Sequence, residues 1–364
     1  MRVRCLAGFA AVMFLASCVG GEGSTDPQPT SSPPPAVGTE PSNSYSPSGR
    51  IFFFSNSEQG ANHNTSSGPA FQYYDFATQR FQTVFRYSSG DGYYTSLDHG
   101  TKALFINRRY GSDASYDILQ AYVFETPSGQ QLYRWQALAG VIRAIPKGSV
   151  DGQYVSLGIS PPGAEEEAVE LQIRDLSGQL VYTSDAFGQW AWLRNGKMLV
   201  IPKQPGNTAS AYSFLQLDIT TGQTRPLFNL QADPSKGEPG QFSQSPDGKQ
   251  LAFTWGNHIH VINLDGSGLH QVTQGALGEA YASWSPDGAY LLFKYPGFAT
   301  DVDDGSLRYG GSTEAFVVPA TAIRADPGNQ SPANPIRVKA PFNGIGELET
   351  RGIYTTTGGL TWEF

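Results

Sequence analysis

Residues 283–293 read Ser-Trp-Ser-Pro-Asp-Gly-Ala-Tyr-Leu-Leu-Phe, and residues 245–253 read Ser-Pro-Asp-Gly-Lys-Gln-Leu-Ala-Phe. Proline presets a negative φ and glycine accepts a positive φ, so each Pro-Asp-Gly predicts a tight turn. The apolar and aromatic residues that follow each turn predict a β-strand. Each copy therefore predicts a hairpin, and the pair indicates an internal repeat.

Weaker copies of this turn run through the chain upstream. The turn glycines of all copies are Gly49, Gly100, Gly152, Gly196, Gly248 and Gly288. A second turn, Ser-Gly-Gln or a variant of it, lies within most repeats and joins two further strands. Repeats of about 40–50 residues with four strands each indicate a β-propeller. The sequence thus predicts an all-β, six-bladed propeller of four-stranded antiparallel blades over residues 46–364, with blades starting near 46, 91, 141, 188, 240 and 280.

The Trp-Ser-Pro-Asp-Gly turn, together with Asn-Leu-Asp-Gly-Ser-Gly-Leu-His-Gln-Val-Thr at 263–273, resembles the WD40-like (PD40) repeat of the TolB-type propeller. The likeness is strongest in blades five and six, and blade two has Asp-His-Gly in place of Pro-Asp-Gly. The resemblance implies a TolB-like architecture. TolB carries an α/β domain before its propeller, whereas this chain has only a linker there, so TolB's role in the Tol–Pal system does not carry over.

The last residues of the chain predict how the propeller closes. Blade one starts near residue 46 without a first strand of its own, and residues 359–364 read Gly-Leu-Thr-Trp-Glu-Phe, like the start of another repeat. We expect this C-terminal strand to pair inside blade one, next to residues 51–54. Such pairing removes an exposed sheet edge and ties the two ends of the propeller together.

The N-terminal residues predict export and a lipid anchor. Residues 1–17 combine two arginines with an apolar stretch too short to span a membrane, which is typical of a signal peptide. The sequence Leu-Ala-Ser-Cys that ends at Cys18 resembles the lipobox of bacterial lipoproteins, which implies cleavage before Cys18 and lipid on its thiol. Val19, where an Asp would retain a lipoprotein at the inner membrane, favours the outer membrane. Residues 18–45 would then be the lipidated cysteine and a flexible Pro/Ser/Gly-rich tether.

Composition and loop lengths indicate what the propeller binds. The net charge is −8 and no basic run exists, which argues against nucleic acid. The connections between the second and third strands are long in five blades, and they share one face of a propeller. Two of them contain Arg-Tyr-Gly, at Arg109-Tyr110 and Arg308-Tyr309. Arg and Tyr suit recognition of a protein or a glycan, so an envelope protein or glycan is the expected partner. The alternative is that these tyrosines pack the connections onto the ends of the blades, since exposed Arg and Tyr are common on any surface.

Two weaker patterns bear on metals and catalysis. Asp301, Asp303 and Asp304 could offer carboxylates to Ca²⁺, but they lack the spacing and the distal Glu of a full calcium loop. His258 and His260 would lie on one side of a strand, without a clear third metal ligand. This pair is the best sequence feature for the alternative, a polysaccharide-active and metal-dependent enzyme like the propeller-fold oligogalacturonate lyases. No catalytic motif is present, so we expect a binding module without a cofactor other than the lipid.

Overall fold

The computed structural model describes residues 48–55, 70–78, 80–86, 92–97, 100–110, 117–126, 128–135, 138–160, 169–203, 210–275, 278–296, 299–300, 307–308, 313–326, 336–337 and 361–363. The chain divides into Met1–Asn43 and Ser44–Phe364, and every described residue belongs to the second unit. Its named elements are β-strands, β1 to β26. Within the described ranges, no helix has the length and apolar character needed to cross a membrane.

Four sheets have four antiparallel strands each. One contains β26 (Thr361–Glu363), β1 (Arg50–Ser55), β2 (Ala70–Asp75) and β3 (Arg80–Arg86). The next contains β12 (Phe187–Trp192), β13 (Met198–Pro202), β14 (Ala211–Leu217) and β15 (Thr224–Gln231). Another contains β16 (Gly240–Gln244), β17 (Gln250–Trp255), β18 (His258–Asn263) and β19 (His270–Gln271). The last contains β20 (Ala280–Trp284), β21 (Tyr290–Pro296), β24 (Thr313–Pro319) and β25 (Ile336–Arg337).

The second and third repeats differ from the predicted separate blades, because they form one eight-stranded sheet. Its strands are β4 (Gly92–Leu97), β5 (Lys102–Tyr110), β6 (Asp117–Glu125), β7 (Gln131–Arg134), β8 (Leu138–Gly148), β9 (Tyr154–Ser160), β10 (Glu170–Asp175) and β11 (Leu180–Ser184). Strand β6 is longer than β7, which pairs only with its second half. The start of β8 pairs with the first half of β6. This pairing occupies a backbone edge that would otherwise be exposed.

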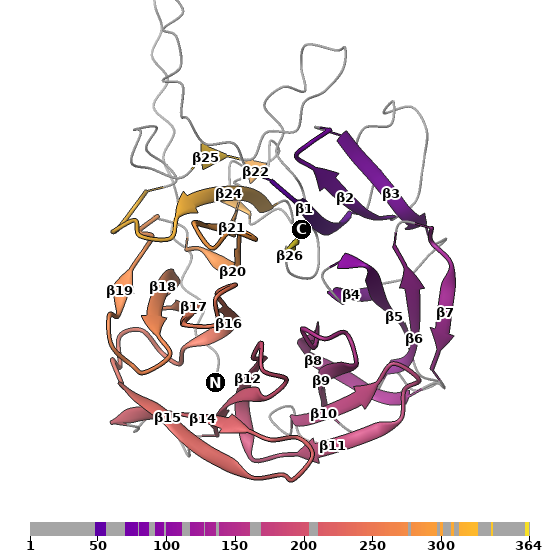
Figure 1. The fold of residues 1–364 in the computed structure, drawn as a ribbon, viewed down its shortest axis with the longest axis horizontal. Helices are drawn as coiled ribbons and strands as arrows, with labels where there is room; N and C mark the ends of the chain where they lie inside the picture. Colours follow the sequence, from indigo (N-terminus) through magenta and orange to yellow (C-terminus); the bar gives the residue numbers. More distant parts are fainter. Residues whose placement is uncertain are drawn as a thin grey trace, which may run out of the picture. The chain divides into compact units, whose positions relative to one another are not determined.

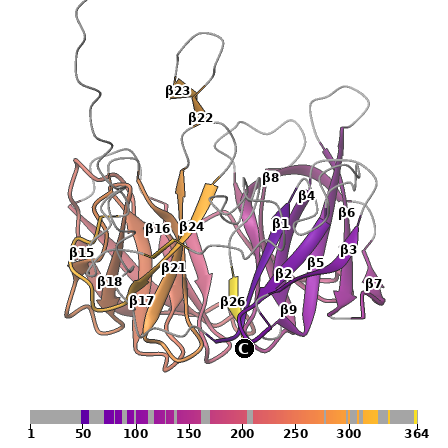
Figure 2. The ribbon, with the colours of Figure 1, turned by 90° about the horizontal axis from the view of Figure 1, so that it is seen from above.

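Figure 1 shows the sheets arranged around a common centre, with β4, β8, β12, β16, β20 and β26 innermost. Strand β26 pairs with β1 in antiparallel register, with Ile51 opposite Trp362, as the sequence predicted for these two segments. The repeats share two faces. The connection face is the side on which the second strand of a repeat ends and the third begins. The turn face is the opposite side. Figure 2 shows β22 (Ala299–Thr300) and β23 (Leu307–Arg308) projecting on the connection side, away from the C-terminus.

The Ser-Pro-Asp-Gly motif works as a hydrogen-bonded turn. In the sixth repeat, Ser285 Oγ donates to Asp287 Oδ1 at 2.5 Å and accepts the backbone N–H of Tyr290 at 2.9 Å. Equivalent bonds link Ser245 with Asp247 and, in a weaker copy of the motif, Ser149 with Asp151. The six turn glycines have φ between 64° and 89°, in agreement with the predicted turns. Only glycine adopts this conformation without a steric penalty.

The motif tryptophan joins neighbouring repeats. The Nε1 of Trp284 donates to the carbonyl oxygen of Ser243 in the preceding repeat, at 3.0 Å. Trp192 makes the corresponding bond to the carbonyl oxygen of Lys147, also at 3.0 Å. Both indoles are buried, so each bond satisfies a donor that would be costly to bury alone. The tryptophan therefore connects one innermost strand to the next.

Aromatic packing between sheets forms much of the core. Phe214 in the fourth repeat stacks on Phe228, with ring centroids 4.3 Å apart, and meets Phe242 of the fifth repeat edge-on at 5.4 Å. Phe242 in turn packs against Phe253 at 5.6 Å. Each such side chain contributes about 1.5–3 kcal/mol when fully buried. Because these contacts cross from one sheet to the next, each repeat depends on its neighbour.

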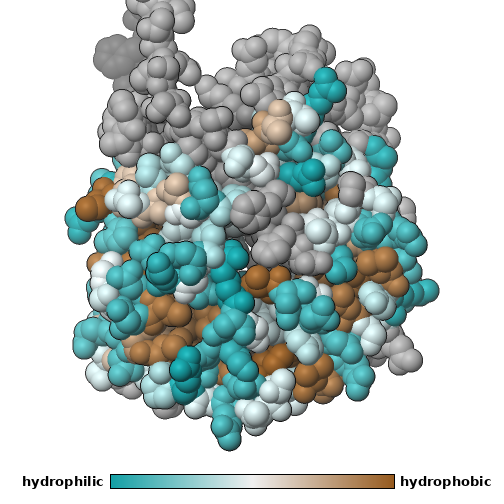
Figure 3. Space-filling model, in the orientation of Figure 1, coloured by the Kyte–Doolittle hydropathy of each residue, from teal (hydrophilic) through white to brown (hydrophobic). Residues whose placement is uncertain are grey.

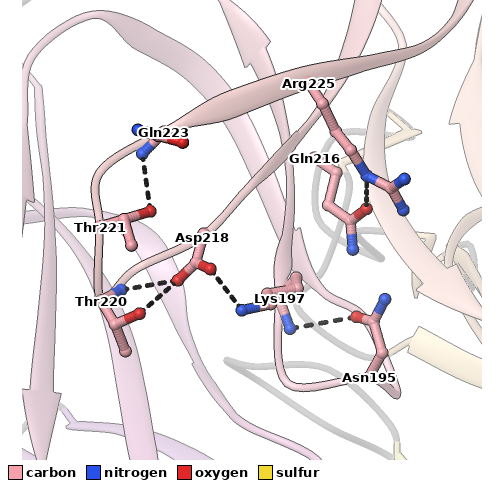
Figure 4. Close-up of polar contacts among 8 residues, drawn as sticks. All are labelled: Asn195, Lys197, Gln216, Asp218, Thr220, Thr221, Gln223 and Arg225. Atoms are coloured by element: carbon pink, nitrogen blue, oxygen red, sulfur yellow. Dashed lines mark hydrogen bonds and ion pairs between the residues drawn. The ribbon is translucent and has the colours of Figure 1, made fainter.

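Charged and hydroxyl side chains stabilise the hairpin turns of the turn face, as Figure 4 shows for the fourth repeat. Asp218 accepts hydrogen bonds from the N–H and Oγ1 of Thr220, at 3.0 and 2.6 Å, and pairs with Lys197 Nζ at 2.5 Å. The bond from Lys197, followed by those from Thr220, holds the pKa of Asp218 well below its usual range. Similar Asp-centred turns recur at Asp175 and Asp265.

Candidate functional site

The connection face carries both arginines of the Arg-Tyr-Gly strings, but their setting differs from the expectation. Arg109 and Tyr110 are the last residues of β5, where they pair with Ile118 and Asp117, and not part of the connection that follows. The prediction that this connection contains them was wrong, because β5 and β6 stay paired for nine residues. Arg308 lies in β23 and pairs with Ala299 of β22. The two arginines therefore lie on the same face, in the second and sixth repeats.

Several predicted positions lie outside the described residues. These are Tyr309, the three acidic residues Asp301, Asp303 and Asp304, and the lipidation residue Cys18. Among the described residues, no three His, Cys, Asp or Glu side chains gather closely enough to hold a metal ion.

The two histidines of β18 have different environments. His260 is buried, with its ring 5.8 Å from that of Phe253 and 5.5 Å from that of Trp255. Its Nδ1 bonds the carbonyl oxygen of His258, and its Nε2 has no hydrogen-bond partner among the residues that the structure describes. Burial lowers the pKa of His260 to about 4, so the ring is neutral at pH 7. His258 instead faces Glu279, so the pair does not converge on one site.

Glu279 is a functional candidate that the sequence did not reveal. Its carboxylate is fully buried and accepts bonds from His258 Nδ1 at 2.8 Å and from Thr273 Oγ1 at 2.7 Å. The backbone N–H of Gly275 donates to the other carboxylate oxygen at 2.6 Å. Burial raises the pKa of Glu279, and the hydrogen bonds oppose this effect. We call these four residues the Glu279 cluster.

The Glu279 cluster joins the fifth and sixth repeats at the connection face. Glu279 is the last residue before β20, and its backbone N–H donates to the carbonyl oxygen of Asn257 at 2.7 Å. The bond between His258 Nδ1 and the Glu279 carboxyl group holds the imidazole ring in one orientation. Among the described residues, none bonds Nε2 of His258. The arrangement is an oriented imidazole, and no hydroxyl or thiol of the described residues bonds its Nε2 as a nucleophile would.

Two innermost strands carry backbone distortions at equivalent positions. Gln241 in β16 and Tyr281 in β20 have φ of 57° and 59°, and each lies within a break in register. Gln241 Oε1 accepts the backbone N–H of Tyr281 at 3.0 Å, which ties the two distortions together. Lys294, which is buried, lies over the Tyr281 ring with Nζ 5.2 Å from the centroid. Strained non-glycine residues of this kind cluster at functional sites.

The large apolar side chains exposed in the described part are concentrated elsewhere. Leu132 and Tyr133 lie on β7, and Leu180 and Val181 on β11. Strand β11 ends its sheet path and β7 branches from β6, and both lie on the outside in Figure 1. Figure 3 shows that, on the face seen in Figure 1, hydrophobic residues lie in small groups between hydrophilic ones. Groups of this size are ordinary on a protein surface.

Comparisons with known proteins place this architecture. No family model and no curated protein sequence matches the chain. The structure of TolB from Acinetobacter baumannii matches with a TM-score of 0.51 and 16% identity, over 75% of this chain and 61% of that one. A putative 6-phosphogluconolactonase from Bacteroides uniformis matches with a TM-score of 0.47 and 13% identity, over 79% of this chain and 94% of that one.

An oligogalacturonate lyase in complex with manganese matches with a TM-score of 0.44 and 15% identity, over 62% of this chain and 68% of that one. The match to TolB covers 61% of that chain, so this chain spans less than two thirds of the length of the TolB structure. At these identities a likeness shows only the fold. The chain is an all-β protein whose antiparallel sheets form a β-propeller similar to that of TolB.

Proposed function

We propose that this protein is a cell-envelope lipoprotein whose closed, six-bladed propeller is a binding module displayed from a membrane. Six innermost strands support the blade count: β4, β8, β12, β16, β20 and β26. The pairing of β26 with β1 supports closure, because it completes the sheet of the first repeat with the last strand of the chain. The lipobox at Cys18, the tether over 18–45 and Val19 support anchoring at the outer membrane.

The connection face is the proposed binding surface, and one observation carries this proposal. Arg109 and Arg308, far apart in the sequence, both lie on this face, each at the end of a paired strand segment. A guanidinium held on a strand offers a planar set of donors for carboxylates or sugar hydroxyls. An envelope protein or a glycan is therefore the proposed partner.

Replacement of both Arg109 and Arg308 by alanine is expected to weaken partner binding about tenfold, since each loss removes charge-assisted hydrogen bonds. Envelope extracts of the source cells, captured on the lipidated protein and identified by mass spectrometry, supply the partner, and its affinity is then measured. Arg225→Ala is the matched control, because Arg225 lies near the turn face and bonds Gln216 (Figure 4). Equal affinity of the double variant and the wild type would reject the connection face.

Cys18→Ser is expected to move the protein from the membrane fraction to the soluble fraction of the producing bacterium. The reason is that the thiol is the proposed attachment point of the acyl chains, each CH₂ of which contributes about 0.8 kcal/mol to membrane binding. Fractionation followed by mass spectrometry of the N-terminal peptide checks both location and lipid. Cys5→Ser is the control and leaves the protein in the membrane. A Cys18→Ser protein that stays membrane-bound contradicts the anchor.

The alternative of a metal-dependent, polysaccharide-active enzyme has less support from the described residues. His260 is enclosed by Phe253 and Trp255, and His258 is engaged by Glu279. The two imidazoles would have to leave these partners to bind one metal ion. The oriented His258 alone is the observation that favours an enzyme. Metal analysis of the purified protein, with and without His258→Ala, tests this alternative directly.

A further inference from the structure

The side chain of Lys147 reaches between two innermost strands that are not neighbours. Lys147 lies near the end of β8, and its Nζ donates to the carbonyl oxygen of Phe242 in β16 at 3.0 Å. Strand β12 lies between β8 and β16 in the ring (Figure 1), and its Trp192 bonds the Lys147 carbonyl oxygen. The ammonium group of Lys147 therefore contacts a strand that lies two repeats further along the chain.

Among the described residues, this ammonium group has no acidic partner. No carboxylate in that part of the chain forms an ion pair with Lys147 Nζ, although the protein has a net charge of −8. Burial alone lowers the pKa of Lys147 to about 8, so the group is still protonated at pH 7. An ammonium carries three N–H donors, and the bond to Phe242 uses one of them. A partly buried positive charge is stabilised when an anionic ligand neutralises it.

A second buried lysine lies in the sixth repeat. Lys294 in β21 is buried over the ring of Tyr281, and burial lowers its pKa to about 7. The backbone N–H of Tyr281 bonds Gln241, the residue immediately before Phe242. Phe242, which accepts the bond from Lys147, is therefore linked through its neighbour Gln241 to Tyr281, the residue whose ring lies under Lys294. Both ends of this connection carry a desolvated lysine.

We propose that the inner side of β8, β16 and β20 binds a small oxyanion, a carboxylate or a phosphate, with the ammonium group of Lys147 as its main charge partner. Oxyanions match the site because they supply both the missing negative charge and several acceptors for the remaining N–H groups. This site is distinct from the proposed binding surface at the connection face. The experiments on one site therefore do not test the other.

Calorimetric titration of the purified full chain with inorganic phosphate, and separately with malonate, tests the site at constant ionic strength. We expect saturable binding of at least one probe and a loss of affinity of at least tenfold in Lys147→Met. Lys147→Arg keeps the charge and retains binding. Lys203→Met is the matched control, because Lys203 Nζ also donates to a carbonyl oxygen, that of Val169 at 2.8 Å, but from an exposed position.

A second measurement does not depend on the folding of any variant. In protein labelled with ¹⁵N-lysine, the bound probe is expected to shift one ammonium signal strongly, that of Lys147. Binding of phosphate alone assigns the site to phosphate groups, and binding of malonate alone assigns it to carboxylates. Absence of saturable binding to the wild type, or unchanged affinity in Lys147→Met, overturns the proposal.

Discussion

Removal of residues 358–364 is expected to lower the midpoint of thermal unfolding by about 5 °C or more. The deletion removes β26 and leaves β1 with an unpaired edge over residues 50–52. Loss of three paired residues removes several backbone hydrogen bonds, each with a net contribution of about 0.5–1.5 kcal/mol. For a domain of this size, each kcal/mol corresponds to about 2–4 °C.

The matched control replaces residues 358–364 with a Gly/Ser segment of equal length. This control keeps the chain length but removes the strand-forming residues, so it should melt like the deletion. Circular dichroism and differential scanning calorimetry measure the midpoint. An unchanged midpoint in the deletion would show that β26 does not hold the first repeat, and it would remove the support for closure of the ring.

Glu279→Ala is expected to lower the free energy of unfolding by about 3 kcal/mol, the largest effect of a single substitution that we predict. The change leaves the Thr273 hydroxyl and the Gly275 N–H buried without their acceptor, and each such group costs about 1–3 kcal/mol. It also releases His258 from its fixed orientation. Urea unfolding followed by tryptophan fluorescence gives the value.

Two further variants separate the causes of this effect. Glu279→Gln keeps an acceptor oxygen for one donor of the cluster, so its loss should be smaller than that of the alanine variant. Glu238→Ala removes an exposed carboxylate from the preceding inter-repeat connection and should stay within about 0.5 kcal/mol of the wild type. A near-neutral Glu279→Ala would show that water replaces the carboxylate, and the Glu279 cluster would then have no role in stability.

The Glu279 cluster and the Lys147 site share one physical basis. Both place an ionisable group in a fully or partly buried position, but its partners differ. Three hydrogen bonds satisfy the Glu279 carboxylate, whereas Lys147 has one carbonyl acceptor and no counter-charge within the part of the chain that the structure describes. In the Glu279 cluster, hydrogen bonds from the chain satisfy the carboxylate and join two repeats. The ammonium group of Lys147 has N–H donors left over, which is why we assign a ligand to Lys147 and not to Glu279.

Local features of the fold were readable from the sequence. The Pro-Asp-Gly and Ser-Gly-Gln turns, the strands beside them and the four-strand period follow from steric preferences that act over a few residues. The serine and aspartate of the motif also act locally, since their bonds span two to five residues. The pairing of β26 with β1 was predictable because one repeat lacked a strand and the chain ended with one to spare.

Contacts between distant strands required the tertiary structure. The joining of β6 to β8 depends on how far β7 extends, and the sequence pattern does not encode that length. Glu279 meets His258, and Lys147 meets Phe242, only because the fold brings residues from different repeats together. The sequence by itself therefore determined the repeating turns and strands, which depend on short-range sterics. The three-dimensional packing decided which charges are buried and with which partners, because burial depends on residues from other repeats.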